Sequence, residues 1–472
     1  MVTYLTDNGL ISPDQHGART GRSTITQLLD QHDRVLEALG NNSNLDIIYL
    51  DFAKAFDVVD ISILLTKMKE MGIKGKLLSW LKVFLCNHTH QVRIENTLSD
   101  PRAVTSGVPQ GSVLGPLLFL IFIQDLGIDM ENAMIHILKF VDDTKVMGDI
   151  KNEDDILMLQ NNLDKIYSWA YDINMRWNNG KFQILRIGSN KELIEDTLLF
   201  SPDYENVIES KSFIKDLGIL VDTDMRYCEQ MDAAVRKSNK KISWIFRTFS
   251  TRNIDFLRKI WKSLVQCHLD YGSTLWSPVS RKLELRSLEG PLRAYTKRGS
   301  EIYKYNYWDR LKFFKLSSVQ RQNDRYRILY IWKSLNGMVP SLGLKWKKIN
   351  YLRAGPQLEI KKPKGSLGVQ HLQRDSISNY GARLFNNLPA SLRTFSGTLI
   401  TFKTNLDKLL QHYPDQPATE HLTPQCEDIF GQPSNSLIDW MRRVRVPESG
   451  LVFLPCGNDN VRVTEEAQPS PK

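Results

Sequence analysis

The sequence predicts an α+β domain followed by a basic and mostly helical region. Up to about residue 220, short apolar runs rich in β-branched residues alternate with segments of helical periodicity. Beyond Met231 the pattern is largely helical, up to about Pro340. The 472 residues, 42% of them hydrophobic, allow two or three domains. We therefore expect an α+β domain over 1–220, a basic region over 221–410 and a loosely ordered, proline-containing tail over 411–472.

The first elements are predicted from periodicity and capping. Residues 24–39 place apolar side chains at helical spacing. Residues 45–52 form a compact apolar run, which indicates a buried strand. Asp60 is a suitable N-cap for the helix that follows it, and a second helix is expected near Gly75.

The later elements of the α+β domain are predicted in the same way. Residues 91–94 and 103–105 are expected to pair as strands, and an apolar helix is expected to follow the loop at residues 106–111. Residues 135–141 and 144–147 flank Asp142 and Asp143 in the pattern of a β-hairpin. A helix is expected to start at Asn152, followed by a strand over 182–187.

Three aspartates lie where these strands end. Asp51 ends the apolar strand, and Asp142 and Asp143 lie side by side at the hairpin tip. Taken singly, such residues are ordinary caps or turn residues. Together they suit nucleotidyl transfer, which uses two divalent metals roughly 3.5–4 Å apart. Mg²⁺ prefers carboxylate oxygens, and clustered carboxylates repel one another unless cations bind between them.

The segment between these aspartates is rich in glycine and proline. Ser106–Pro116 places three glycines and two prolines around Gln110. Because glycine lacks a Cβ, such a loop lets the backbone approach a flat ligand closely. An ordinary strand-to-helix connection is the alternative interpretation.

Charge is distributed unevenly along the chain. Residues 1–230 hold 22 Lys and Arg against 33 Asp and Glu, residues 231–380 hold 31 against 10, and residues 381–472 hold 9 against 10. These counts give net charges of −11, +21 and −1, which together make the overall +9. A basic middle region suggests a polyanionic partner such as nucleic acid. A solvated lysine-rich surface is the alternative.

Several other classes of protein are disfavoured. The five cysteines are scattered without a C-x-x-C pair, so neither a zinc finger nor a disulfide framework is indicated. The N-terminus has no secretory signal pattern, and the longest apolar run, 113–123, is too short to span a membrane. We expect an intracellular protein, and the sequence does not choose between nucleus and cytoplasm.

Three motifs resemble those of the reverse transcriptases of non-LTR retrotransposons, with the jockey-like and CR1-like elements most similar. They are Tyr49–Asp57, Ser106–Pro116 and Phe140–Thr144. The resemblance continues through Lys215–Gly218, Tyr271–Pro278 and Phe385–Pro389, and covers roughly residues 10–410. It implies a right-hand polymerase palm with partial fingers, followed by a thumb-like, basic nucleic-acid-binding region.

The resemblance also implies roles for individual residues. Asp51, Asp142 and Asp143 would bind two Mg²⁺ ions, for which Mn²⁺ can substitute, and would form the catalytic triad. The remaining roles concern the nucleotide pocket. The backbone carbonyl of Phe52 would face a metal, and the ring of Phe56 would act as a steric gate against the ribose 2′-hydroxyl. Gln110 and Gly111 would line the pocket for the incoming nucleotide and template. Lys181 would protonate the leaving pyrophosphate. A solvated lysine is the alternative for Lys181.

The implied reaction is template-directed DNA synthesis, with an RNA template, a DNA primer and dNTPs as partners. No membrane partner is implied, and protein partners are not indicated. Four basic residues at helical spacing, Arg236, Lys237, Lys240 and Lys241, are the candidates for nucleic-acid binding.

The chain departs from the family pattern at its start. Members of the family carry further finger strands before the segment that resembles His16–Thr24, and these strands hold the triphosphate. Two hypotheses follow: an active RNA-directed DNA polymerase, or a truncated and impaired transposon remnant that acts at most as a nucleic-acid-binding module. A third is a host protein that uses the fold as an RNA-binding scaffold.

Overall fold

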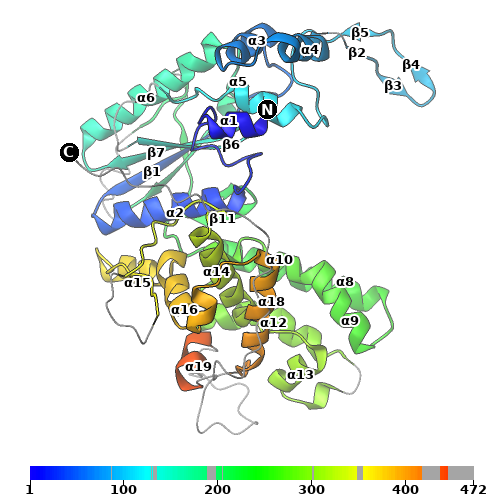
Figure 1. Ribbon diagram of the computed structural model, residues 1–472, viewed down its shortest axis with the longest axis vertical. Coiled ribbons are helices and arrows are strands. Elements are labelled where there is room, and N and C mark those ends of the chain that lie inside the picture. Colours follow the sequence, from blue (N-terminus) through cyan, green and yellow to red (C-terminus); the bar gives the residue numbers. More distant parts are fainter. Residues whose placement is uncertain are drawn as a thin grey trace. The chain divides into compact units, whose positions relative to one another are not determined.

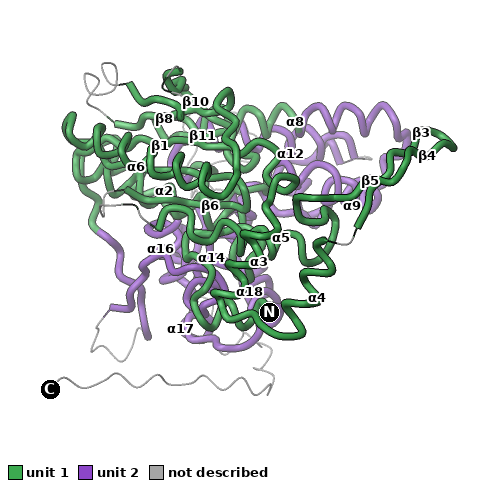
Figure 2. Tube along the Cα trace, turned by 90° about the horizontal axis from the view of Figure 1, so that it is seen from above, with its two compact units in different colours: residues 1–237, 270–278, 362–376 green, residues 238–269, 279–361, 377–472 purple. Residues whose placement is uncertain are grey.

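The structure is a computed structural model (Figure 1) that describes residues 1–86, 88–128, 130, 135–188, 198–202, 204, 206–299, 302–347, 355–416 and 436–444. The chain forms two compact units (Figure 2). Unit 1 contains residues 1–237, 270–278 and 362–376, and unit 2 contains residues 238–269, 279–361 and 377–472. The domain boundaries at residues 220 and 410 remain predictions.

A five-stranded sheet forms the centre of unit 1. Its strands lie in the order β6 (Ile135–Phe140), β7 (Asp143–Ile150), β1 (Asn44–Leu50), β8 (Gln183–Ile187) and β9 (Glu209–Ser210). The pairs are antiparallel except for β8 and β9, which run parallel. In the register between β1 and β7, Leu50 lies opposite Thr144.

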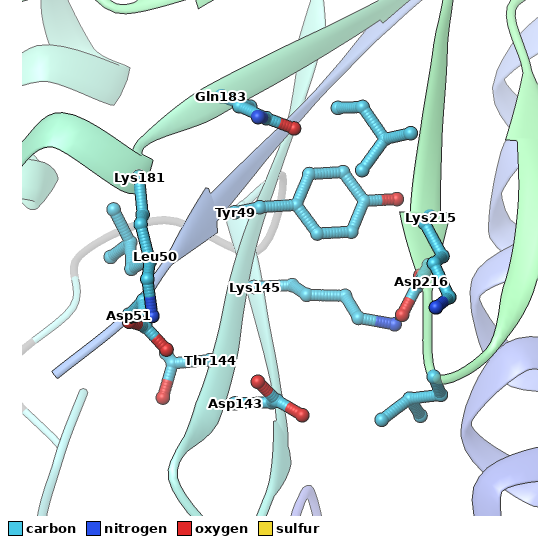
Figure 3. A pocket seen from close by; sticks show the side chains of 12 residues that line it. Tyr49, Leu50, Asp51, Asp143, Thr144, Lys145, Lys181, Gln183, Lys215 and Asp216 are labelled. Carbon is cyan, nitrogen blue, oxygen red and sulfur yellow. Dashed lines mark hydrogen bonds and ion pairs between the residues drawn. The ribbon is translucent and has the colours of Figure 1, made fainter.

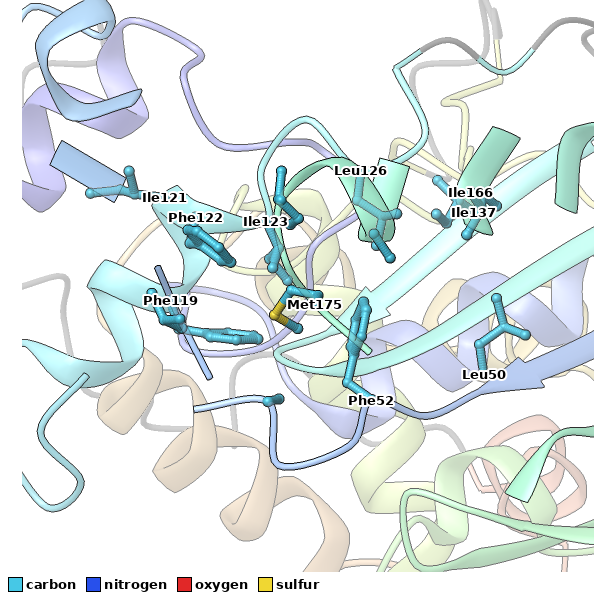
Figure 4. Packing of buried hydrophobic residues seen from close by; sticks show 14 of the residues in the cluster. Leu50, Phe52, Phe119, Ile121, Phe122, Ile123, Leu126, Ile137, Ile166 and Met175 are labelled. Atoms are coloured by element: carbon cyan, nitrogen blue, oxygen red, sulfur yellow. The ribbon is translucent and has the colours of Figure 1, made fainter. Parts of the chain in front are cut away.

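The two faces of β1 are both buried, as its continuous apolar run predicts. Side chains alternate between the faces of a strand. Ile48 and Leu50 belong to the main hydrophobic cluster, which also contains most apolar residues of α5 (Gly115–Phe122) and residues of α6 (Glu153–Asp172) (Figure 4). Leu45 and Ile47 are buried outside that cluster. Helix α2 (Thr24–Gly40) packs on β1 and β6, and α6 packs on β7.

Local signals place the helices of this unit. Asp60 accepts hydrogen bonds from Ser62 N and Ile63 N at the start of α3 (Ile61–Glu70). Asn152 forms a capping box with Asp155 at the start of α6. Helix α4 (Gly75–Cys86) also lies where a helix was expected. Each prediction rested on a cap or a periodic apolar face, both of which are local features.

The predicted pairing of residues 91–94 with 103–105 is wrong. Strand β3 (Arg93–Ile94) pairs with β4 (Thr97–Leu98), and β2 (Thr89–His90) pairs with β5 (Arg102–Ala103). Glu95 has a φ of +51°, which helps to close a two-residue turn between β3 and β4. This local hairpin forms at a smaller loop-closure cost than the longer pairing.

Short segments from distant parts of the chain complete unit 1. They include α1 (Val2–Asp7), the hairpin of β10 (Phe213–Asp216) and β11 (Ile219–Asp222), α11 (Ser273–Trp276) and α15 (Leu367–Asp375). Helices α11 and α15 both pack on α2. Unit 1 is therefore not contiguous in the sequence.

Unit 2 is helical in its described residues, apart from an isolated bridge between Trp346 and Leu358. Helix α8 (Cys228–Thr248) begins in unit 1 and continues into unit 2, and α10 (Gln266–Asp270) ends at the next boundary. The remaining helices of the unit are α9 (Ile254–Ile260), η2 (Trp261–Val265), α12 (Lys282–Thr296), η3 (Ile302–Lys304), α13 (Tyr307–Phe314), α14 (Val319–Leu335), η4 (Ile377–Gly381), α16 (Ala382–Asn386), α17 (Ala390–Arg393), α18 (Leu399–Gln411) and α19 (Leu437–Arg443).

The predicted tail lies mostly outside the described residues, because 417–435 and 445–472 are not among them. Within the described part of the chain, no helix has both the length and the apolar character that crossing a membrane requires. The mixture of helix and sheet agrees with the predicted α+β class.

Candidate active site

Two of the predicted aspartates project into one pocket because of strand periodicity. Asp51 directly follows β1, and Asp143 is the first residue of β7. Leu50 pairs with Thr144, so Asp51 and Asp143 lie on the same face of the sheet as Tyr49. The pocket has a volume of about 240 Å³ (Figure 3).

The pocket is built entirely from residues of unit 1, and charged or polar groups make up much of its wall. The lining residues are Tyr49, Leu50, Asp51, Asp143, Thr144, Lys145, Lys181, Gln183, Ile214, Lys215, Asp216 and Leu217.

Asp142 lies in the turn rather than in the strand. Phe140 pairs with Asp143 in the β6–β7 hairpin, so the two turn residues are Val141 and Asp142. Both aspartates were expected at the hairpin tip, but only Asp142 lies in the turn, because Asp143 is already part of strand β7. Asp142 does not line the pocket, although its charge acts on Asp143.

The charge of Asp51 disfavours the ionisation of both Asp142 and Asp143. Desolvation, and then the charges of Asp142, Asp216 and Asp51, raise the pKa of Asp143 to about 6. Asp143 keeps an exposed surface, but the surrounding protein still desolvates its carboxyl. The pKa of Asp142 is also raised, by desolvation and by the charge of Asp51. A bound cation would relieve this repulsion.

Lys181 already contacts one of these carboxylates. It ends the short 3₁₀ helix η1 (Asn179–Lys181), and its Nζ lies 2.8 Å from Asp51 Oδ2. The hydrogen bond to Asp51, and then the charge of Asp51, raise the pKa of Lys181. The backbone N–H of Asn178 donates to the carbonyl of Asp51 at 2.8 Å, which fixes the position of η1 beside the end of β1.

The donor set suits a hard divalent cation, because it consists of carboxylate oxygens. Among the described residues, however, no three His, Cys, Asp or Glu side chains form a ready-made metal-binding cluster. Lys181 provides the positive charge beside Asp51 instead.

A second ion pair lies in the same pocket and was missed by the sequence analysis. Lys145 Nζ lies 2.5 Å from Asp216 Oδ2 and 3.0 Å from Gln31 Oε1. Both charged side chains are almost fully buried, at 2% and 3% exposure. The Tyr49 ring lies 5.7 Å from Lys145 Nζ, and Gln31 donates to the Tyr49 hydroxyl. The available signal was a lysine within a predicted strand, and its acidic partner is 71 residues away.

The two phenylalanines of the first motif are packed. Phe52 is 4% exposed, and its ring stacks on Trp177 with a centroid distance of 3.9 Å. Phe56 is half-buried and stacks on Phe119 at 4.6 Å. Neither phenylalanine lines the pocket.

The glycine-rich loop is attached to the turn that follows β1. Gln110 Nε2 donates to Asp57 Oδ1 at 2.7 Å. Gly107 has a φ of +90°, and a Cβ there would lie 2.9 Å from the carbonyl oxygens of Phe56 and Asp57. Gly111 has a φ of +78° with open space around it. The structure therefore places Gln110 near the first motif, although neither Gln110 nor Gly111 lines the pocket.

The four basic candidates lie on α8 and away from the pocket lining. Arg236, Lys237 and Lys240 are exposed. Lys241 is half-buried, with its Nζ 5.0 Å from the ring centroid of Trp244. They form two adjacent pairs one helical turn apart, which places them on one side of the helix.

Comparisons with known proteins agree with these features. Residues 1–257 match the family described as reverse transcriptase (RNA-dependent DNA polymerase). The chain is 27% identical over 291 residues to the probable RNA-directed DNA polymerase from transposon BS of Drosophila melanogaster, covering 58% of this chain and 31% of that protein. It is 29% identical over 272 residues to the RNA-directed DNA polymerase from the mobile element jockey of the same species, covering 55% and 29%.

The chain thus spans about a third of the length of these curated relatives. Among solved structures, apo telomerase from Candida tropicalis aligns with a TM-score of 0.40 and 10% sequence identity, covering 93% of this chain and 58% of that one. The family match covers more than half of the chain and includes all three motifs. The chain belongs to the reverse transcriptase (RNA-dependent DNA polymerase) family, and the predicted resemblance to non-LTR retrotransposon enzymes is confirmed.

Proposed function

We propose that this chain catalyses RNA-directed DNA synthesis, in which a dNTP is joined to the 3′-hydroxyl of a DNA primer on an RNA template. The main support is the pocket at the ends of β1 and β7. Asp51 and Asp143 line it, and desolvation together with the charges of neighbouring carboxylates raises the pKa of Asp143. Such coupled carboxylates are typical of sites that hold cations.

Asp51, Asp142 and Asp143 would hold two Mg²⁺ ions, with Mn²⁺ as a substitute. When bound, such ions supply activation of the primer hydroxyl and neutralisation of the triphosphate charge. Asp51 Oδ2 now accepts from Lys181, so an ion that binds this oxygen would compete with the lysine. Lys181 would then be available to donate a proton to the departing pyrophosphate.

The surrounding residues would select the nucleotide. Phe56 is held by stacking on Phe119, so its ring edge is a suitable barrier to a ribose 2′-hydroxyl. Gln110 and Gly111 would contact the nucleotide and template from a loop fixed to Asp57. The carbonyl of Phe52 would face a metal, while the Phe52 ring stacks on Trp177.

Helix α8 would bind the phosphates of the template and primer. Arg236, Lys237, Lys240 and Lys241 present positive charge along one side of this helix. Four neutralised phosphates of a duplex would give a slope of about −3.6 in log affinity against log salt concentration. In this proposal residues 1–220 act as palm and partial fingers, and 221–410 as a thumb-like region. The protein would work inside the cell, where RNA templates and dNTPs occur.

The proposal is tested by primer extension with the purified chain, poly(rA), oligo(dT), dTTP and either Mg²⁺ or Mn²⁺. The matched control is the Asp142→Ala/Asp143→Ala variant. We expect the variant to lose at least about a thousandfold in rate, or about 4 kcal/mol of transition-state stabilisation, because carboxylates that hold the ions are lost.

Near-normal synthesis by the variant would refute the site assignment. Absent synthesis by the wild-type chain, with salt-sensitive RNA binding intact, would instead support a nucleic-acid-binding remnant without polymerase activity. Binding is measured by fluorescence anisotropy of a labelled RNA–DNA duplex.

A further inference from the structure

The turn between β6 and β7 contains a backbone conformation that its residue disfavours. Val141 has a φ of +57°. A β-branched residue at positive φ is a steric outlier, because its Cβ substituents crowd the neighbouring backbone. Such strain persists only where surrounding contacts hold it. Val141 directly precedes Asp142 and Asp143, so its conformation sets the direction in which both carboxylates leave the hairpin.

A buried glutamine from the N-terminal segment holds this residue. Gln15 is 2% exposed. Its Oε1 accepts from the backbone N–H of Val141 at 2.9 Å, and its Nε2 donates to the carbonyl of Val141 at 3.3 Å. One amide side chain therefore satisfies both backbone groups of the strained residue.

The glutamine is itself fixed in place. Its Oε1 also accepts from Gly17 N at 2.8 Å. On either side of Gln15, His16 N donates to the carbonyl of Lys139 at 2.7 Å and Lys139 N donates to the carbonyl of Asp14 at 2.9 Å. His16 Nδ1 lies 2.8 Å from Thr26 Oγ1 at the start of α2. The segment is thus bonded both to β6 and to a helix of the same unit.

Gly17 shows how closely this segment approaches the turn. A Cβ built at Gly17 would lie 2.5 Å from both the backbone nitrogen and Cγ2 of Val141. Only glycine fits this contact without movement of the turn. Gln15 and Gly17 together therefore act on Val141 from one side, the first by hydrogen bonds and the second by close packing.

We propose that Gln15 is a positioning residue, which holds Val141 in the left-handed conformation and thereby directs Asp142 and Asp143. Its effect on synthesis rests on the proposed function, whereas its effect on the backbone does not. The predicted consequence is an energetic coupling between residues 15 and 141. Removal of the glutamine amide should lower kcat less when residue 141 is one that adopts positive φ without strain.

The test compares Gln15→Leu, Val141→Gly and the double variant in the full chain. The control is Gln27→Leu, because Gln27 is fully buried in α2 and has no hydrogen-bond partner among the described residues. Hydrogen exchange of the fragment covering residues 138–145 is followed by mass spectrometry. We expect faster exchange in Gln15→Leu, because the Val141 amide loses its acceptor, and wild-type exchange in Gln27→Leu.

Primer extension provides the second readout. Gln15→Leu is expected to lower kcat by roughly 10- to 100-fold with little change in KM for the primer. Adding Val141→Gly to the Gln15→Leu chain should raise kcat again by roughly fivefold or more, because glycine adopts positive φ freely. If Gln15→Leu does not fold, Gly17→Ala serves in its place, since its methyl displaces the turn while every hydrogen-bonding group remains.

Wild-type exchange at residues 138–145 in the Gln15→Leu chain would overturn the proposal. Failure of Val141→Gly to restore any activity to a folded Gln15→Leu chain would also overturn it. If the wild-type chain makes no DNA, the proposed function fails, but the exchange experiment still decides whether Gln15 holds the turn.

Discussion

The pocket contains two lysine–aspartate pairs in very different environments. Lys181 and Asp51 meet at 2.8 Å with side-chain exposures of 63% and 25%. Lys145 and Asp216 meet at 2.5 Å with exposures of 2% and 3%. Water can replace either partner in the first pair, so separating its charges is inexpensive. In the second pair both charges are almost fully shielded from water, so removing one partner leaves the charge of the other uncompensated.

This difference suggests a division of roles. The exposed pair can open to admit a cation, while the buried pair joins β7 to β10 and keeps the strand end fixed. Gln31 and Tyr49 extend the buried pair to α2 and β1. Asp143 therefore shares the pocket with one exposed ion pair and one buried polar network. Three predictions test this contrast.

The largest expected effect is at the buried pair. Asp216→Leu leaves the Lys145 ammonium buried and unpaired, and we expect a stability loss of about 3–5 kcal/mol in urea unfolding. The double variant Lys145→Met/Asp216→Leu should lose much less, because both charges are gone and the volume is kept. Equal losses in the single and double variants would show that the pair is not energetically coupled.

A smaller effect is expected from pH. Burial and neighbouring carboxylates raise the pKa of Asp143 from 3.8 to about 6, so the folded state holds this proton more tightly than the unfolded state. Between these two values, metal-free stability should fall as pH rises. Mn²⁺ binds the ionised carboxylates, so the stabilisation it gives should grow over the same range.

The measurement is the thermal midpoint across this pH range in EDTA and in Mn²⁺. Burial also raises the pKa of Asp46 to about 6, so the wild-type slope alone is not specific. The informative quantity is the difference from Asp143→Asn, which lacks the titrating group. Identical pH profiles for the two chains would contradict the assignment of Asp143.

The smallest effect is expected at the exposed pair. Lys181→Met removes the cation that now contacts Asp51, and we expect Mn²⁺ to bind roughly two- to fivefold more tightly, with no measurable change in thermal midpoint without metal. Mn²⁺ affinity is measured by isothermal titration calorimetry. Lys215→Met is the matched control, because Lys215 also lines the pocket and is exposed. Weaker Mn²⁺ binding by Lys181→Met would show that the lysine supports the ion instead of competing with it.

Much of the α+β unit could be predicted because its signals are local. The apolar run of β1, the hairpin around Asp142 and the caps at Asp60 and Asn152 each depend on neighbouring residues. The pairing of residues 91–94 was predicted wrongly, since several short strands competed and the sequence does not show which turn closes first.

The polar connections of the site could not be predicted, because they join distant parts of the chain. Lys145 and Asp216 are 71 residues apart, and Gln15 and Val141 are 126 apart. The conformation of Val141 runs against the local preference of its side chain, so only the folded environment explains it. Motif similarity indicated which carboxylates matter, whereas the groups that hold them became visible only in three dimensions.

The register between β1 and β7 links the formation of the pocket to the formation of the hydrophobic core. A slip by one residue would turn every side chain of β1 to the opposite face. Ile48 and Leu50 would then leave the hydrophobic cluster in the same event that turned Asp51 out of the pocket. A partly misfolded preparation should therefore contain some molecules with an intact Mn²⁺ site and others with none, and few molecules with a partly formed site. Counting Mn²⁺ sites per chain would give the yield of correctly folded protein directly.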